Sequence, residues 1–139
     1  MRRHLTLNGL EGVVVCDVAV SDATGTLKMA EGDSPSEFHA DAGGSVEVRA
    51  VTLDDWLSES GAPPPDVVKI DVEGSDDAVL RGGARSFAKY RPSIYLALHG
   101  ERQRRACRDL LASWGYVVTS LEPGLVPDLS SEWLAEPLG

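Results

Sequence analysis

The chain has few cysteines, a shortage of basic residues and no long apolar run, and each shortage excludes a class of protein. Its two cysteines, Cys16 and Cys107, lie far apart without a CxxC motif or a nearby histidine pair, so the pattern predicts neither a metal site nor a disulfide scaffold. Thirteen Lys and Arg stand against 22 Asp and Glu, and the resulting net charge of -9 argues against binding along a nucleic-acid backbone. No segment approaches the roughly 18 consecutive apolar residues that a transmembrane helix needs.

The remaining composition indicates one ordinary globular domain. A length of 139 residues fits a single domain over residues 1–139. At the start of the chain, two arginines precede only a brief, interrupted apolar stretch, which does not match a signal peptide. A reduced, cytoplasmic setting is therefore expected, with neither nucleic acid nor a membrane as a partner.

Strand and helix patterns alternate along the chain, which predicts an α/β domain containing parallel strands. Residues 13–20 are almost continuously apolar and predict a strand buried on both faces, with Cys16 as a small core residue. Residues 67–74, VVKIDVEG, predict a second buried parallel strand. Residues 31–44 are polar and glycine-rich and predict a mobile surface loop.

The sequence predicts further strands and helices along the rest of the chain. A hairpin is expected from residues 26–30 and 46–53, and a helix after Ser75 should break at Gly82-Gly83. The remaining strands are expected at residues 93–98, 116–121 and around 133–135, and the remaining helices at residues 3–8, from 54, and at 101–114.

Polar residues follow three of the predicted strands. Asp71, Glu73 and Gly74 end one strand, and His99 follows the next. Ser21 and Asp22 follow the strand at 13–20. Ligands of parallel sheets bind beyond the carboxyl ends of the strands, so these residues are the candidate site.

Two carboxylates two residues apart on a strand point to the same side, and this places Asp71 beside Glu73. Such a pair can share a proton, bind a cation, or diverge as the strand ends. The acids can equally serve the start of the following helix, where negative charge is favourable. His99 can likewise be an ordinary surface residue after a strand.

Several motifs in this chain resemble the second half of the FkbM-type methyltransferase domain. They are Leu53-Asp54-Asp55, the stretch KIDVEG at 69–74, Val79-Leu80-Arg81-Gly82 and Arg91-Pro92. Upstream, LTLNGL and VAVSDATGTL also match elements of the family. The resemblance covers roughly residues 3–100.

The resemblance implies a Rossmann-like class I methyltransferase sheet, mostly parallel, with helices on both faces. It implies S-adenosylmethionine as cofactor and O-methylation of a small molecule or sugar. By this resemblance Asp71 faces the methyl donor and acceptor, with Gly74 beside the cofactor. Ser21 and Asp22 would lie near the adenine, while Glu73 and His99 would line the acceptor side, where histidine suits proton removal near neutral pH.

Three departures from the family pattern bear on this expectation. Asp76 stands where the family usually has Glu, a mild change. The stretch Ala97-Leu98-His99 stands where the family has a Glu before the histidine, an acid that can orient it. The family's glycine-rich cofactor loop is absent from these residues, which predicts an N-terminally truncated domain, poor cofactor binding and an inactive chain.

Two alternatives to an active methyltransferase follow from these departures. One is a non-enzymatic remnant or partner subunit that completes a site with another chain, either a different polypeptide or a second copy. The other treats Asp71 and Glu73 as ligands of a divalent cation, although hard cations prefer several oxygens at once and a third clustered acid is offered only by Asp76 or Asp77.

Overall fold

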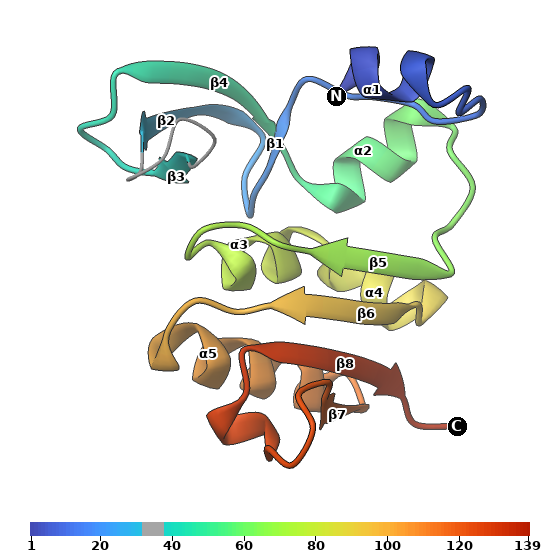
Figure 1. Cartoon of the computed structure of the whole chain (residues 1–139), viewed down its shortest axis with the longest axis vertical. Helices are drawn as coiled ribbons and strands as arrows, with labels where there is room; N and C mark the ends of the chain where they lie inside the picture. The colour runs from blue at the N-terminus through green and yellow to red at the C-terminus, as the bar shows by residue number, and fades with distance from the viewer. Residues whose placement is uncertain (32–37) are drawn as a thin grey trace.

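The computed structural model of the chain describes residues 1–31 and 38–139, and within them forms two four-stranded sheets with helices (Figure 1). The first sheet has the order β1-β4-β2-β3 and contains β1 (Ala19–Val20), β2 (Gly25–Glu31), β3 (Phe38–Ala40) and β4 (Val46–Val51). The second has the order β5-β6-β8-β7 and contains β5 (Val67–Ile70), β6 (Ser93–Ala97), β7 (Tyr116–Ser120) and β8 (Glu132–Pro137). The helices are α1 (Arg2–Leu7), α2 (Leu53–Ser60), α3 (Asp76–Gly82), α4 (Ala84–Tyr90), α5 (Glu101–Ser113) and the 3-10 turn η1 (Pro127–Leu129).

The α/β class is confirmed, but the expectation of a mostly parallel sheet is wrong. Only β1 with β4 and β5 with β6 are parallel, and the other strand pairs are antiparallel. The reason is connectivity, because the β2–β4 hairpin and the direct return from β7 to β8 reverse the chain without a crossover helix. The hairpin itself was expected and is confirmed by the pairing of Leu27 with Val48.

Helices on both faces were also expected, and this too is wrong for the part of the chain that is described. Helices α4 and α5 lie behind the second sheet, whereas the near face of β5, β6 and β8 carries no described helix (Figure 1). As a result, alternate side chains of these strands remain accessible. Tyr95, opposite Lys69 on the neighbouring strand, is one example.

Strand β5 is parallel as predicted, yet it is not a buried strand along its length. It occupies the edge of its sheet and ends at Ile70, before Asp71. Val67 is 60% exposed and only Ile70 is buried. Its edge position and the uncovered near face explain this difference.

The predicted buried strand at residues 13–20 is largely wrong. Only Ala19 and Val20 pair with a neighbour, β4, and Val14 is 81% exposed. Cys16, expected in the core, is exposed. Helix α1 lies beside this segment, and Arg2 donates a hydrogen bond to the carbonyl oxygen of Val15, but residues 13–18 pair with no described strand and most of them remain exposed.

Part of the predicted loop at 31–44 lies outside the described residues. Residues 38–40, which were expected to be irregular, form β3 and pair antiparallel with β2.

One core lies between the second sheet and its helices. Its fully buried members include Leu80, Phe87, Ile94, Leu111 and Trp133. The break between α3 and α4 at Gly83 was predicted from the paired glycines and is confirmed. Packing accounts for these glycines, since a Cβ on Gly83 would lie 2.4 Å from the Phe87 ring.

The Leu-Asp-Asp motif fixes α2 to α4. One Asp54 carboxylate oxygen accepts hydrogen bonds from the backbone N–H and hydroxyl of Ser86, and the other accepts from the backbone N–H of Arg85. Asp54 thus caps a helix other than its own. Burial alone would raise the pKa of Asp54, but the bonds from Ser86 and Arg85 hold that pKa below its usual value.

The loop after β1 meets helix α3 at a close backbone contact. A Cβ on Gly82 would lie 1.9 Å from the carbonyl oxygen of Ser21. Arg81 reinforces the contact by pairing with Asp22 at 3.1 Å and with Asp77 at 2.7 Å. The loop after β1 is therefore packed directly on α3.

Gly82→Ala is expected to lower the free energy of unfolding by at least about 2 kcal/mol, because the added methyl must push the Ser21 backbone away from α3. Gly25→Ala is the matched control, since a Cβ there would meet no atom within 4 Å. Urea unfolding of both variants measures the difference. Equal stabilities would show that this backbone contact is not required.

Candidate active site at the ends of two parallel strands

Strands β5 and β6 run parallel and end side by side, so the residues that follow them share one edge of the sheet. Glu73 follows β5 and His99 follows β6. The structure brings the two together, with 3.7 Å between Glu73 Oε2 and His99 Nε2. Their side chains are 42% and 45% exposed, so both are accessible to solvent.

Asp71 does not join this pair. Its carboxylate accepts a hydrogen bond from Lys69 Nζ at 2.5 Å, and this bond raises the pKa of Lys69. Asp71 and Glu73 therefore contact different side chains, a lysine and a histidine.

Gly74 turns the chain from β5 toward α3 with a φ of +73°. A side chain at this φ would be strained, although a Cβ would meet only Gln103 Nε2, at 3.9 Å. The buried Gln103 side chain of α5 donates a hydrogen bond to the carbonyl oxygen of Gly74. This partner was missed in the sequence, where Gln103 looks like any polar residue of an amphipathic helix.

Asp76 begins α3 directly beneath this turn. Its side chain is 0% exposed and receives no hydrogen bond from a described side chain. Burial raises the pKa of Asp76 to about 6, and the backbone N–H groups of Asp76 and Val72, together with the charge of His99, oppose this rise only in part. Sequence comparison marked Asp76 as a departure from the family pattern but did not predict it as a site residue.

Ser21 and Asp22 contact helix α3. Ser21 is buried, its backbone presses on Gly82, and Asp22 receives two bonds from the Arg81 guanidinium. The end of β1 is thereby joined to α3. A role for Ser21 and Asp22 beside an adenine stays a prediction.

Comparison with known proteins assigns the family. The family described as the methyltransferase FkbM domain matches residues 4–118, which is most of the chain. The chain belongs to the FkbM methyltransferase family.

Two individual proteins are similar to this FkbM chain. The 2-O-methyltransferase NoeI of Sinorhizobium fredii is 35% identical over 80 residues, which cover 53% of this chain and 32% of that protein. The crystal structure of methyltransferase FkbM from Methylobacillus flagellatus matches 97% of this chain and 31% of its own, with a TM-score of 0.61 and 19% identity, a likeness of fold. The chain thus spans about a third of the length of both relatives.

The described residues fit a methyl donor of the S-adenosylmethionine type in part. The half-exposed carboxylates of Asp71 and Glu73 suit its positive sulfonium group, and the tight turn at Gly74 admits a ligand close to the backbone. Ser21, by contrast, is buried by packing. The fit therefore lies at the end of β5 rather than at the end of β1.

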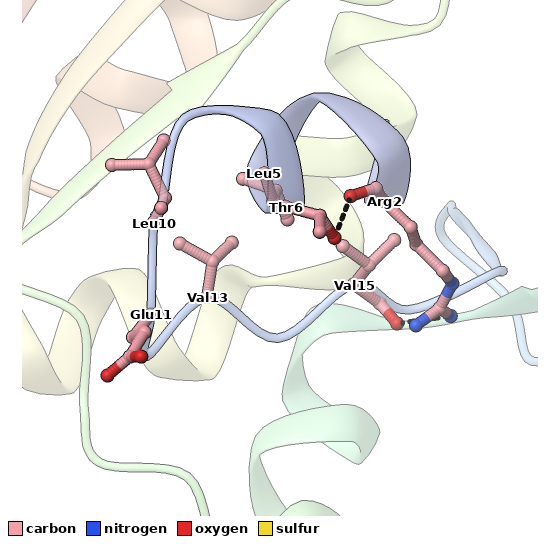
Figure 2. Close-up of a pocket in the computed structure, with 8 residues that line it drawn as sticks. Arg2, Leu5, Thr6, Leu10, Glu11, Val13 and Val15 are labelled. Carbon is pink, nitrogen blue, oxygen red and sulfur yellow. Dashed lines mark hydrogen bonds between the residues drawn. The ribbon is translucent and has the colours of Figure 1, made fainter.

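Other features of this FkbM chain lie apart from the edge. A surface hollow of about 420 Å³ is bounded by α1 and the segment after it, including Leu5, Leu10 and Val13, and contains no residue of the candidate site (Figure 2). Within the described residues, no three His, Cys, Asp or Glu side chains are grouped to hold a metal ion. Over the same residues, no helix has the length and apolarity to cross a membrane.

The buried charge of Asp76 predicts an unusual pH dependence. Because its folded pKa is raised, the protonated carboxyl contributes stability at about pH 4 that is lost as the pH rises through about 6. Asp76→Asn is expected to unfold with a free energy about 1–3 kcal/mol higher than the parent chain at pH 7.5, and with little difference at pH 4. Denaturant titrations at both pH values measure this. The exposed Asp109→Asn serves as control, and a variant destabilised at pH 7.5 would contradict the buried charge.

Proposed function

We propose that the chain is the part of an S-adenosylmethionine-dependent methyltransferase that carries the proton-accepting residues for O-methylation of a small molecule or sugar. The observation that supports this most directly is the Glu73–His99 pair at the ends of adjacent parallel strands. The name of NoeI, a 2-O-methyltransferase, supports a hydroxyl group as the acceptor.

Methyl transfer to a hydroxyl requires the acceptor oxygen to lose its proton. S-adenosylmethionine, when bound, supplies the methyl group. His99 takes the proton at an imidazole nitrogen, since its unperturbed pKa lies near neutrality. Glu73 stabilises the imidazolium that forms, and Asp71 at the end of β5 faces the positive charge of the donor.

The contact between Glu73 and His99 also compensates for an acid that the family has before the histidine and this chain lacks. The stretch Ala97-Leu98-His99 lacks the Glu that the family places before the histidine. In this chain a carboxylate reaches the imidazole from the neighbouring strand end instead. An acid is therefore available to orient His99 despite the replacement.

His99→Gln is expected to reduce the rate of methyl transfer to a hydroxyl acceptor by about 100-fold or more, in the range of general base catalysis. Transfer of labelled methyl groups to a panel of sugars and small hydroxyl compounds measures this, with any partner chain present. The exposed Arg105→Gln on α5 is the control. A His99→Gln variant as active as the control would refute the role of His99.

A second function is favoured by the unpaired edges of the two sheets. We propose as the alternative that the chain is a non-enzymatic subunit completing a site with another polypeptide or with a second copy. Both β1 and β5 are edge strands, and apolar side chains near β1 are accessible, among them Leu7, Leu10 and Val14. Accessible strand edges and apolar side chains of this kind favour association with another chain.

Cofactor titration separates these functions. Because a glycine-rich loop after a strand is absent from the sequence, the chain alone is expected to bind S-adenosylhomocysteine more weakly than a Kd of roughly 1 µM, if at all. Isothermal titration calorimetry measures the affinity, and sedimentation measures self-association. Micromolar binding by the monomer would contradict the need for a second chain.

A further inference from the structure

The turn that carries Glu73 is held by a side chain from another element. Residues 71–75 lie between β5 and α3, and Gly74 has a φ of +73°. Among the described residues, no backbone–backbone hydrogen bond reaches Glu73 or Gly74. In that part of the chain, the backbone of these two residues makes one hydrogen bond, which the Gln103 side chain donates to the Gly74 carbonyl oxygen. The position of the turn therefore depends on Gln103.

Gln103 is itself part of the packed interior. It lies on α5 with 3% of its surface exposed, on the same helix face as Cys107 and Leu111, which are fully buried one and two turns further on. Close packing leaves a side chain at such a position little freedom to move. The turn after β5 is thus bonded to a well-packed part of the fold.

Burial alone does not account for a glutamine on this face of α5. A buried amide is unfavourable unless its polar atoms are hydrogen-bonded. The Nε2 atom of Gln103 has its partner in Gly74, but Oε1 is buried without a donor among the described residues. An apolar side chain of similar length would avoid this unpaired atom. The bond to Gly74 is therefore the contact that distinguishes Gln103 from an ordinary core residue.

This bond connects the two strand ends that carry the candidate pair. Gly74 directly follows Glu73, after β5, and α5 begins two residues after His99, which follows β6. Gln103 therefore links the chain on one side of the pair to the chain on the other. An accessible ion pair holds its own geometry only weakly, so the 3.7 Å between Glu73 Oε2 and His99 Nε2 depends on how the two strand ends are held.

We propose that Gln103 is a positioning residue, which holds the Gly74 turn so that Glu73 stays in contact with His99. The inference deepens the proposed methyl transfer and rests on it. In the proton step the acceptor O–H bond breaks, its electron pair stays on oxygen, and a new N–H bond forms on His99. Glu73 stabilises the positive charge that this step creates, and Gln103 acts on the step only through the position of Glu73.

The geometric part of the inference is tested without any cofactor. Gln103→Met fills a similar volume but cannot donate a hydrogen bond, and Leu111→Met introduces the same side chain on the same buried face as a control. NMR spectroscopy measures the NOE between the Glu73 side chain and the His99 ring, and the backbone order parameters of Glu73 and Gly74. Gln103→Met is expected to abolish the NOE and to lower the order parameters from about 0.85 to below about 0.6. Leu111→Met is expected to leave both unchanged.

Activity then distinguishes positioning from a merely structural role. With any partner chain present, Gln103→Met is expected to lower kcat roughly ten-fold with little change in KM. The double variant with Glu73→Gln is expected to be no slower than Glu73→Gln alone, because both changes remove the same interaction. Gln103→Leu, a second apolar side chain without a donor, is measured in the same way should the Met variant fail to fold.

The outcomes separate this inference from the proposed function. If the NOE is absent from the parent chain, or if the NOE and the order parameters are unchanged in Gln103→Met, the inference is overturned whatever the activity. If they change but the rate losses of Gln103→Met and Glu73→Gln multiply in the double variant, action through Glu73 is overturned while the proposed function stands. If the parent chain transfers no methyl group even with its partner, the proposed function fails, and the NMR comparison still decides whether Gln103 sets the geometry of the pair.

Discussion

The position of α3 depends on one close backbone contact, the approach of the Ser21 carbonyl to Gly82. Only glycine permits this separation, because any Cβ would occupy the space of the oxygen. The Arg81 guanidinium pairs with both Asp22 and Asp77 across the contact. Because these ion pairs are directional and packing is not, they fix the position of α3 along the loop after β1. Since α3 begins at Asp76, the same contact determines where the buried carboxylate lies relative to His99. The loop after β1 thus positions the candidate site without contributing a side chain that touches it.

Burial and charge oppose each other at Asp76. A fully buried carboxylate without a side-chain donor destabilises the folded chain at neutral pH, and a neutral side chain of the same shape would relieve this. A fold selected for stability alone would not retain the charge there. Asp54, which is also largely buried, does not have this cost, because several donors satisfy its carboxylate. The two aspartates differ in their donors and also in depth, since Asp76 is fully buried and the side chain of Asp54 is 10% exposed.

Sequence patterns predicted the features that depend on neighbouring residues. The hairpin of β2 and β4, the helix break at Gly83 and the polar end of the VVKIDVEG strand all arise from local chemistry. The pattern failed where the outcome depends on a distant partner. Residues 13–18 are apolar enough for a core but pair with no described strand and stay mostly exposed. The insertion of β8 between β6 and β7 has no signal in the local sequence. Gln103 and Asp76 were missed as site residues for the same reason, because their importance comes from the packing of α5 against α3.

Proton acceptance and cofactor binding, the two parts of the proposed chemistry, require different parts of the fold. Proton acceptance needs β5, β6, α3 and α5, and these share a core with Leu80, Ile94 and Trp133 fully buried, so this corner is held by the chain's own residues. Holding a charged nucleotide cofactor needs backbone N–H groups from a tight loop and a partner for the ribose, which the accessible edges of β1 and β5 do not provide. A chain that spans about a third of its relatives can therefore retain an ordered proton site while depending on other residues for the methyl donor. On this argument the unpaired edge of β5 is where such residues would act, since it lies next to the strand end that carries Asp71 and Glu73.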